Sequence, residues 1–427
     1  MNIDILKKLQ KEAPDLKIRT INNINIIFFE TLCNSNDIND FILKPIVMNN
    51  INDYSKLIKI PFGNYKEINN EKDLFFCLYS GFTIINIKNK FIACETKYPL
   101  NSSISEATNE KVVKGPKDAF TENYQNNIGL IRKRIRSKDL KVNEYVVGSE
   151  SKTKVGLLYL DNVCDKDLVN EIDTKIKNID IDYLLSINNN ICKKSYTFPT
   201  YIMTERPDLV SFMLMEGRIV IITENNQEVL IIPTFFIDIF KSIDDHYQNR
   251  INVTITRIIR IIAFLTSIIV PGLYIALTTF NQETLPTSVL INFSMQREGV
   301  PFPSFIEAII LWVTFEILRE ADTRVPFVVG SSMSIVGALV LGQAAVEAGL
   351  ISPIMIIVIA ISSVSSFLFN DNDVVNSIRI WKLIFLILGS FTGLYGIFIG
   401  TVLFFTRICS IKSFSYDYIK EKLWKRY

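Results

Sequence analysis

The chain has 427 residues, with 46 Lys and Arg against 44 Asp and Glu and a formal net charge of +2. This balance gives no reason to expect nucleic-acid binding, which needs a basic surface that neutralises phosphates. The single histidine, His246, excludes a histidine-based metal site and a histidine-dependent triad. The six cysteines have no CxxC or metal-like spacing, so we expect reduced thiols, no metal and no cofactor.

The two halves of the chain differ in hydropathy. Charges are frequent up to about residue 257, whereas uncharged apolar segments dominate from there to about residue 405. The first residues lack an apolar core with a cleavage site, so we expect a cytoplasmic N-terminal region. The sequence therefore predicts a multi-domain membrane protein, with a cytoplasmic α/β region of two related subdomains followed by an all-α transmembrane domain. The expected boundaries are 1–125 for α/β subdomain 1, 126–250 for α/β subdomain 2, 251–410 for the transmembrane helical domain and 411–427 for a short cytoplasmic tail.

A faint internal repeat supports the two subdomains. FFCLYSGFTIINIKNKFIACET and FMLMEGRIVIITENNQEVLIIP each contain a helix-like segment, a glycine (Gly81 or Gly217), and two apolar runs around a polar turn. The glycine fits a left-handed helix cap, and the two runs predict a β-hairpin. TKVGLLYLD and KDLVNEIDTKIKNI, upstream of the second hairpin, predict a strand and a helix that join the same sheet.

No catalytic motif is present in this region. There is no GxGxxG, P-loop, nucleophile elbow or acidic metal cluster, so an enzyme is not expected. KGPKDAF indicates a Gly-Pro turn rather than a phosphate site. TERPDLV indicates the start of a capped surface helix, with Pro207 in its first turn.

Four uncharged segments are long enough to span a bilayer: 261–282, 325–346, 348–370 and 383–406. Basic residues precede the first segment and follow the last, so both termini are expected in the cytoplasm. An even number of crossings satisfies this orientation. The prediction is thus about four spans plus an amphipathic or re-entrant helix, formed by FIEAIILWVTFEILREADTRVPFVVG between the first two spans, at the far face or dipping into the membrane from it.

Two spans carry stripes of small residues. One stripe predicts close helix packing through Gly389, Gly393, Gly396 and Gly400, which would share one helix face. The other is compatible with ordinary packing or with a pore lining, because small side chains leave room for water. Gln343 and Glu347 would tune ion passage near the cytoplasmic mouth of such a pore. The pore or gate candidates are Ser334, Ala338, Gly342, Gln343, Ala345 and Glu347.

The charged helix between the first two spans is amphipathic. Its charges have i,i+3 and i,i+4 spacing, which favours pairing within the helix or contacts to neighbouring helices or subunits. Glu307 differs, because it lies on the apolar side and must find a partner, be protonated or face water. The candidate contact charges are Glu307, Glu316, Arg319, Glu320 and Arg324.

These residues carry a family resemblance. REGVPFPSFIEAIILWVTFEILREADTRVP, SIVGALVLGQAAVEAGLISP, KGPKDAFTENYQNNIGLIRKRI and the TERPD…LMEGRIVII…VLIIP pattern resemble the A-subunit family of bacterial spore germination receptors (GerA type). The resemblance runs from about residue 70 to residue 415. It departs at SFSYDYIKEKLWKRY, where family members continue into a longer cytoplasmic tail, so contacts that depend on the tail are an open question.

The resemblance implies a role and partners. Family members act in the inner membrane of dormant endospores with a transporter-like, nutrient-binding B subunit and a lipoprotein C subunit. The A subunit is expected to oligomerise, as a pentamer, into a nutrient-gated ion channel. The alternatives are a membrane scaffold or signal-transmitting subunit, or a secondary-transporter subunit, without conductance of its own.

Overall fold

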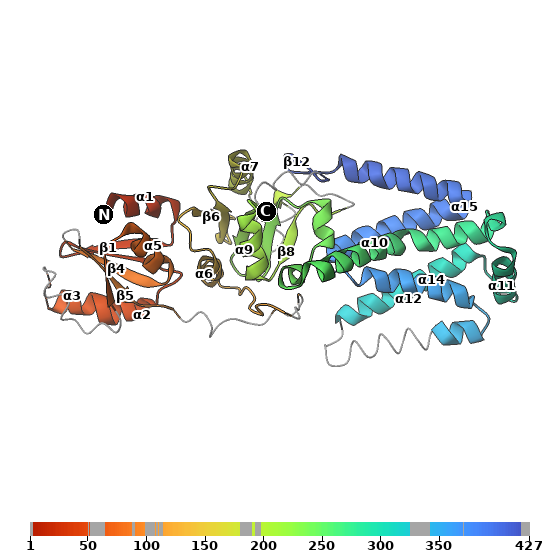
Figure 1. Cartoon of the computed structure of the whole chain (residues 1–427), viewed down its shortest axis with the longest axis horizontal. Helices are drawn as coiled ribbons and strands as arrows, with labels where there is room; N and C mark the ends of the chain where they lie inside the picture. Colours follow the sequence, from red (N-terminus) through yellow and green to blue (C-terminus); the bar gives the residue numbers. More distant parts are fainter. Residues whose placement is uncertain are drawn as a thin grey trace.

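The computed structural model describes residues 3–49, 51, 65–87, 90–98, 107, 110, 114–179, 190–192, 198–324, 342–369 and 371–419. These residues form an elongated molecule with three parts in a row (Figure 1). An N-terminal α/β subdomain lies at one end, a second α/β subdomain lies in the middle, and a group of long helices forms the other end.

Subdomain 1 is built on a five-stranded antiparallel sheet of order β1-β2-β4-β5-β3. Helix α5 (Glu71–Tyr79) is followed by Gly81, where the chain turns into the next strand. The φ of Gly81 is +83°, which only glycine adopts readily. The remaining elements are α1 (Ile3–Glu12), β1 (Leu16–Ile21), β2 (Ile24–Phe29), α2 (Ser35–Asp37), the π-helical η1 (Ile38–Leu43), α3 (Lys44–Met48), β3 (Tyr65–Ile68), β4 (Phe82–Ile87) and β5 (Lys90–Glu95).

Subdomain 2 repeats this topology, with strand order β6-β7-β9-β10-β8. Gly217, with φ +88°, stands where Gly81 stands in subdomain 1. Both predicted hairpins and the internal repeat are therefore confirmed, as are the predicted strand β7 and helix α7. The elements are α6 (Tyr124–Arg134), β6 (Leu140–Val147), β7 (Thr153–Leu160), α7 (Lys166–Lys177), β8 (Ile202–Thr204), α9 (Pro207–Met215), β9 (Ile219–Thr223) and β10 (Val229–Ile232).

Subdomain 2 has a hydrophobic core on each face of its sheet. Val220 and Ile222 of β9 pack with α6 and α9, whereas Ile219 and Ile221 pack with α7 on the other face. Successive strand side chains point to opposite faces, so a continuous apolar run is buried on both sides. Between the subdomains, the guanidinium of Arg132 in α6 donates to the Asp15 carboxylate at 2.6 and 2.7 Å, and both side chains are buried.

The helical part turns apolar side chains outward. Exposed isoleucines and phenylalanines run along α10, α12, α14 and α15, while serines and charged groups are buried among these helices. Two of the described helices, α10 and α15, are long and apolar enough to cross a membrane by length and composition. The elements are η4 (Phe236–Phe240), η5 (Ile243–Tyr247), α10 (Arg250–Thr279), η6 (Gln282–Thr284), α11 (Thr287–Arg297), α12 (Ser304–Arg324), α14 (Pro353–Ser366) and α15 (Asn372–Ser410).

Helix α15 is not the single straight span that residues 383–406 predict. Its backbone breaks at Gly393, with φ +64° and ψ −143°, and the chain folds back on itself (Figure 1). The rings of Trp381 and Phe404 are 5.0 Å apart, and a Cβ placed on Gly400 would lie 3.0 Å from the Phe385 ring. Such pairs meet only if the two arms run antiparallel as a helical hairpin.

Helix α12 does not lie across the far face, the first of its two expected placements, but runs from that end along α14. Its first turn contacts Ser352, just before α14, and its later turns contact Ser366 and Phe367 at the end of α14. The two helices therefore run side by side in one direction. This extra passage returns residues 368, 369 and 371–374 to the face next to subdomain 2, where a four-crossing order would not put them. The four-span count is thus not confirmed.

The segment after α15 packs on subdomain 2. Its strands β11 (Lys412–Ser413) and β12 (Tyr416–Asp417) pair with each other, and the Ser413 hydroxyl donates to the carbonyl of Thr200 at 3.0 Å. The Tyr418 side chain is fully buried, and its hydroxyl donates to the Pro199 carbonyl at 2.8 Å. Residues 411–419 are therefore a docked strap that joins the helices to subdomain 2.

Candidate functional site

Glu307 is fully buried, and it has partners. One carboxylate oxygen accepts from the backbone N–H and the hydroxyl of Ser352 at 2.9 and 2.8 Å. The other lies 3.8 Å from the guanidinium of Arg297 in α11. Ser352 is 45 residues away in the chain, so its contact with Glu307 ties the start of α12 to the start of α14. Because burial of a lone charge is costly, these partners explain how the carboxylate is accommodated.

A second charged group lies further along α12. Arg379 of α15 approaches the Glu316 carboxylate at 2.7 Å, and Arg319 lies at 3.8 Å from the same oxygen. The Arg319 guanidinium also donates to the Ser366 hydroxyl and stacks 4.7 Å from the Phe367 ring. Lys382 is 2% exposed in the same helical hairpin. Glu316 therefore makes both kinds of contact that the charge spacing favours, within α12 to Arg319 and across to Arg379 of α15.

The other predicted site residues are spread out. Ser334 and Ala338 lie outside the described residues, as does the Arg324 side chain, and Glu320 is exposed. Residues 342–347 are helical and lie near the start of α14: a Cβ on Gly342 would be 3.8 Å from Ile356, and Ala345 packs near Tyr274 and Met355. Gln343 donates to Glu347 at 2.9 Å. These residues lie towards the end of the helical part that is remote from subdomain 2 (Figure 1), and their role at the mouth of a pore stays a prediction.

The packing glycines do not share one continuous helix face, because Gly393 is the break between the two arms. A Cβ on Gly389 would lie 2.5 Å from the carbonyl oxygen of Gly272 in α10, so the two backbones touch at that point. Gly396 and Gly400 lie against Leu388 and Phe385 of the opposite arm.

The TERPDLV segment is not a surface helix start. Arg206 is 1% exposed and forms two hydrogen bonds to Asp208, at 3.1 and 2.6 Å. The same guanidinium donates to the backbone carbonyls of Glu110 and Pro116 at 3.1 and 3.0 Å. Pro207 is the first residue of α9, as predicted. Arg206 thus fixes the linker between the subdomains to the helix that it precedes.

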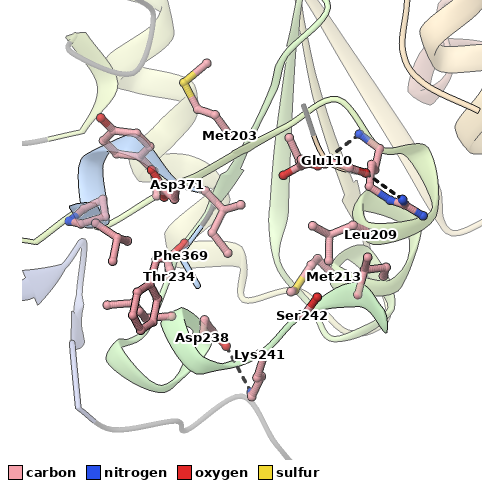
Figure 2. A pocket seen from close by; sticks show the side chains of 18 of the residues that line it. Glu110, Met203, Leu209, Met213, Thr234, Asp238, Lys241, Ser242, Phe369 and Asp371 are labelled. Atoms are coloured by element: carbon pink, nitrogen blue, oxygen red, sulfur yellow. Dashed lines mark hydrogen bonds and ion pairs between the residues drawn. The ribbon is translucent and has the colours of Figure 1, made fainter. Parts of the chain in front are cut away.

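A cavity of about 530 Å³ lies where subdomain 2 meets the helices. Figure 2 shows the apolar side chains of Met203, Leu209, Met213 and Phe369 around it. The first three belong to β8 and α9, whereas Phe369 lies between α14 and α15. The cavity therefore joins a wall from the soluble part to a wall from the helical part, a common setting for a ligand site.

Acidic side chains of this junction cavity have raised pKa values. Burial raises the pKa of Glu110 to about 7 and that of Asp371 to about 6, and burial also raises the pKa of Glu228. Asp371 and Glu228 are exposed and Glu110 is half-buried, and the neighbouring Asp373 adds repulsion at Asp371. Groups with such shifts in a cleft mark a candidate functional site.

Three cationic side chains that line the cavity form ion pairs with Asp245 or Asp238. Arg257 and Arg260 approach Asp245 at 2.8 and 3.0 Å, and Lys241 approaches Asp238 at 3.1 Å. Among the described residues, no ion pair is formed by Glu110, Glu228 or Asp371. The cavity therefore has an excess of negative charge.

Sequence reasoning missed this site. Asp371 and Asp373 lie in the NDND stretch between two apolar segments, where acidic residues without neighbouring lysine or arginine were the available signal. Glu110 and Glu228 are far from them in sequence, and only the fold brings all four to one cavity.

Comparison with known proteins gives consistent matches. The family model described as Bacillus/Clostridium GerA spore germination protein matches residues 4–424. Spore germination protein KA of Bacillus subtilis (strain 168) is 36% identical, over 98% of this chain and 80% of that protein. Spore germination protein GerLA of Bacillus cereus is 30% identical, over 81% and 72%. The N-terminal domain of the A subunit of the Bacillus megaterium spore germinant receptor GerK3 aligns with a TM-score of 0.43 and 28% identity, over 55% of this chain and 94% of that chain.

Proposed function

The chain belongs to the GerA family of Bacillus/Clostridium spore germination proteins, and we propose that it is a germinant receptor A subunit that forms a nutrient-gated ion channel. In this proposal it resides in the spore inner membrane with both termini in the cytoplasm. It assembles into a homo-oligomer, a pentamer, with a nutrient-binding B subunit and a lipoprotein C subunit. It opens when the B subunit binds nutrient.

The observation that supports conduction most directly is the distribution of charge in the helical part. Exposed apolar side chains such as Ile310, Ile317 and Ile361 suit contact with lipid. Polar groups that are buried or half-buried run from Glu307 at one end to Arg319 and Lys382 towards the other. Charged groups inside a membrane domain are costly unless they have partners or water, and they mark ion pathways.

We assign the pore or gate to the small-residue stripe. Ser334, Ala338, Gly342 and Ala345 recur at helical spacing, with Gln343 and Glu347 beside them. In an oligomer, small side chains next to the axis leave a water-filled path, and an amide and a carboxylate bias which ions enter it. In this proposal the buried charges of α12 hold the neighbouring helices in register.

The test is Ala338→Trp in a spore whose only receptor for one nutrient contains this chain. We expect cation release after nutrient addition to change by about tenfold or to become constitutive, because a bulky side chain at the axis alters the open pathway or the gating equilibrium. The matched control is Ile361→Trp, since Ile361 is on the exposed side of α14. Normal accumulation of both variants is checked by immunoblot.

Two results would count against the channel. Unchanged cation release from Ala338→Trp spores that accumulate the protein normally would remove the pore assignment. If purified A, B and C subunits in a planar bilayer show no nutrient-dependent conductance, the chain is a scaffold or signal-transmitting subunit instead.

A further inference from the structure

The junction cavity between subdomain 2 and the helices is a built binding site whose function no family match assigns. Its volume of about 530 Å³ falls within the range of about 300–1,000 Å³ that is usual for small-molecule sites. Its wall combines an apolar part with the carboxyl groups of Glu110, Glu228 and Asp371. Thr234 also lines it, is 3% exposed, and has a hydroxyl with no hydrogen-bond partner among the described residues.

We propose that the junction cavity binds a small organic cation with two or more separated ammonium groups, such as an aliphatic polyamine. Figure 2 shows Glu110 and Asp371 on different sides of the space, with Met203 between them and Leu209 and Met213 on the side of Glu110. A flexible aliphatic chain fits that apolar middle, and ammonium groups at its ends reach the carboxylates. Thr234 provides a further polar contact within the wall.

Charge complementarity selects a cation. The arginine and lysine side chains around the cavity already have carboxylate partners, in Asp245, Asp238 and Asp208. The carboxyls of Glu228 and Asp371 have no cation within ion-pair distance among the described residues. Besides burial, neighbouring carboxylates raise both pKa values: Glu205 and Asp373 raise that of Glu228, and Asp373 and Glu228 raise that of Asp371. A bound ammonium compensates this repulsion and restores the ionised form.

The same geometry disfavours a metal ion. No three Asp, Glu, His or Cys side chains of the described part of the chain are close enough to hold a metal together. A single ion would also leave most of the cavity volume unfilled, whereas a polyamine occupies both the apolar and the acidic parts.

The test is a direct titration of spermidine into the purified full-length chain in lipid nanodiscs, followed by isothermal calorimetry. The main variant combines Glu228→Gln with Asp371→Asn; asparagine preserves the cap that Asp371 provides to α15 through its bond to the Asp373 N–H. We expect spermidine affinity to fall at least about tenfold, since two attractive charge contacts are lost. The control variant combines Glu67→Gln with Glu71→Gln, an equal charge change at exposed sites of subdomain 1, and should leave the affinity unchanged.

Specificity is checked with Ca²⁺, K⁺ and the monoamine butylamine at matched ionic strength, and each should bind more weakly than spermidine. Equal spermidine affinity in the double variant and the wild type would overturn the proposal, as would butylamine binding as tightly as spermidine. Full displacement of spermidine by Ca²⁺ at matched ionic strength would also do so.

A second measurement covers the case in which the double variant is unfolded. In the wild type, spermidine should slow hydrogen exchange in β8 and in residues 368–374, which form the opposite walls. Unchanged exchange in both segments at saturating spermidine would refute the site. The readouts involve binding alone, so their failure leaves the channel proposal standing, and a failed channel test leaves this site untouched.

Discussion

Asp238 is a buried carboxylate of subdomain 2 that accepts four hydrogen bonds. It accepts from Arg218 at 2.7 and 3.0 Å, from Lys241 at 3.1 Å and from the backbone N–H of Phe235 at 2.9 Å. Burial alone would raise the pKa of Asp238, but the Arg218 guanidinium outweighs it and holds that pKa below its usual value. The Asp238–Arg218 ion pair fixes the turn after β10 to the residue that precedes β9.

We expect Asp238→Asn to destabilise the protein by about 3 kcal/mol, because it leaves the buried Arg218 guanidinium without its counter-charge. The pKa of Asp238 in the folded protein is below its value in the unfolded chain, which is near 3.8. The Asp238–Arg218 pair therefore contributes its whole stabilisation above about pH 3.8 and loses it as the pH falls through the pKa of the folded state. Thermal unfolding of the detergent-solubilised chain measures the effect. Asp40→Asn, at the exposed pair with Lys44, should change stability by less than about 1 kcal/mol; an equal loss in both variants would contradict the prediction.

At single residues, the sequence predicts that a buried charge needs a partner but does not identify the partner. The place of Glu307 on an apolar face was visible in the sequence and required a partner, but the partner is Ser352, which no spacing rule connects to it. The sequence favours a surface helix start at Arg206, because Glu205 and Asp208 place two further charges beside it. Its burial depends on Asp208 and on the Glu110 and Pro116 carbonyls, which only the folded linker supplies.

Among the elements, the α/β hairpins were predictable and the helical hairpin was not. A β-hairpin is encoded locally, by two apolar runs around a polar turn, and both β4–β5 and β9–β10 follow that pattern. The α15 hairpin forms within one apolar run with no proline or polar turn. Its reversal at Gly393 depends on long-range contacts: the Asn281 side chain accepts from the Leu394 N–H at 3.0 Å, and Gly389 touches α10.

A cysteine pair tests the helical hairpin. In a Cys409→Ser background, which removes the exposed cysteine, Trp381→Cys with Phe404→Cys should crosslink with a short bismaleimide, because the two native rings are 5.0 Å apart. A continuous helix would separate these positions by roughly 35 Å. The control pair, Trp381→Cys with Phe391→Cys, lies in one arm and should stay uncrosslinked at roughly 15 Å. Crosslinking is read as a mobility shift in membranes, and no shift for the first pair would rule out the hairpin.

At the scale of the whole molecule, two structures link the soluble part to the helices. The connection from β10 through η4 and η5 enters α10, and the strap of residues 411–419 returns from α15 to the same subdomain. The junction cavity is lined by η4 and η5 of the first connection and by residues 368, 369 and 371–374 of the helical part, but not by the strap. A change in the helical hairpin can therefore reach subdomain 2 by two separate routes, through the cavity wall and through the strap.

Substitutions at Tyr418 test whether the strap holds subdomain 2 to the helices. Its ring packs 6.1 Å from the Phe236 ring, its hydroxyl donates to Pro199, and its carbonyl accepts from the Phe236 N–H at 3.0 Å. Tyr418→Ala should destabilise the docked strap by about 3–5 kcal/mol through lost packing, whereas Tyr418→Phe, which removes one hydrogen bond, should cost about 1 kcal/mol. Hydrogen exchange should accelerate at 411–419 and 198–201 in the alanine variant and stay unchanged in β1 and β2 of subdomain 1. If exchange at 198–201 is unaffected, the strap does not hold that side of the junction, and α10 alone joins the helices to the soluble part.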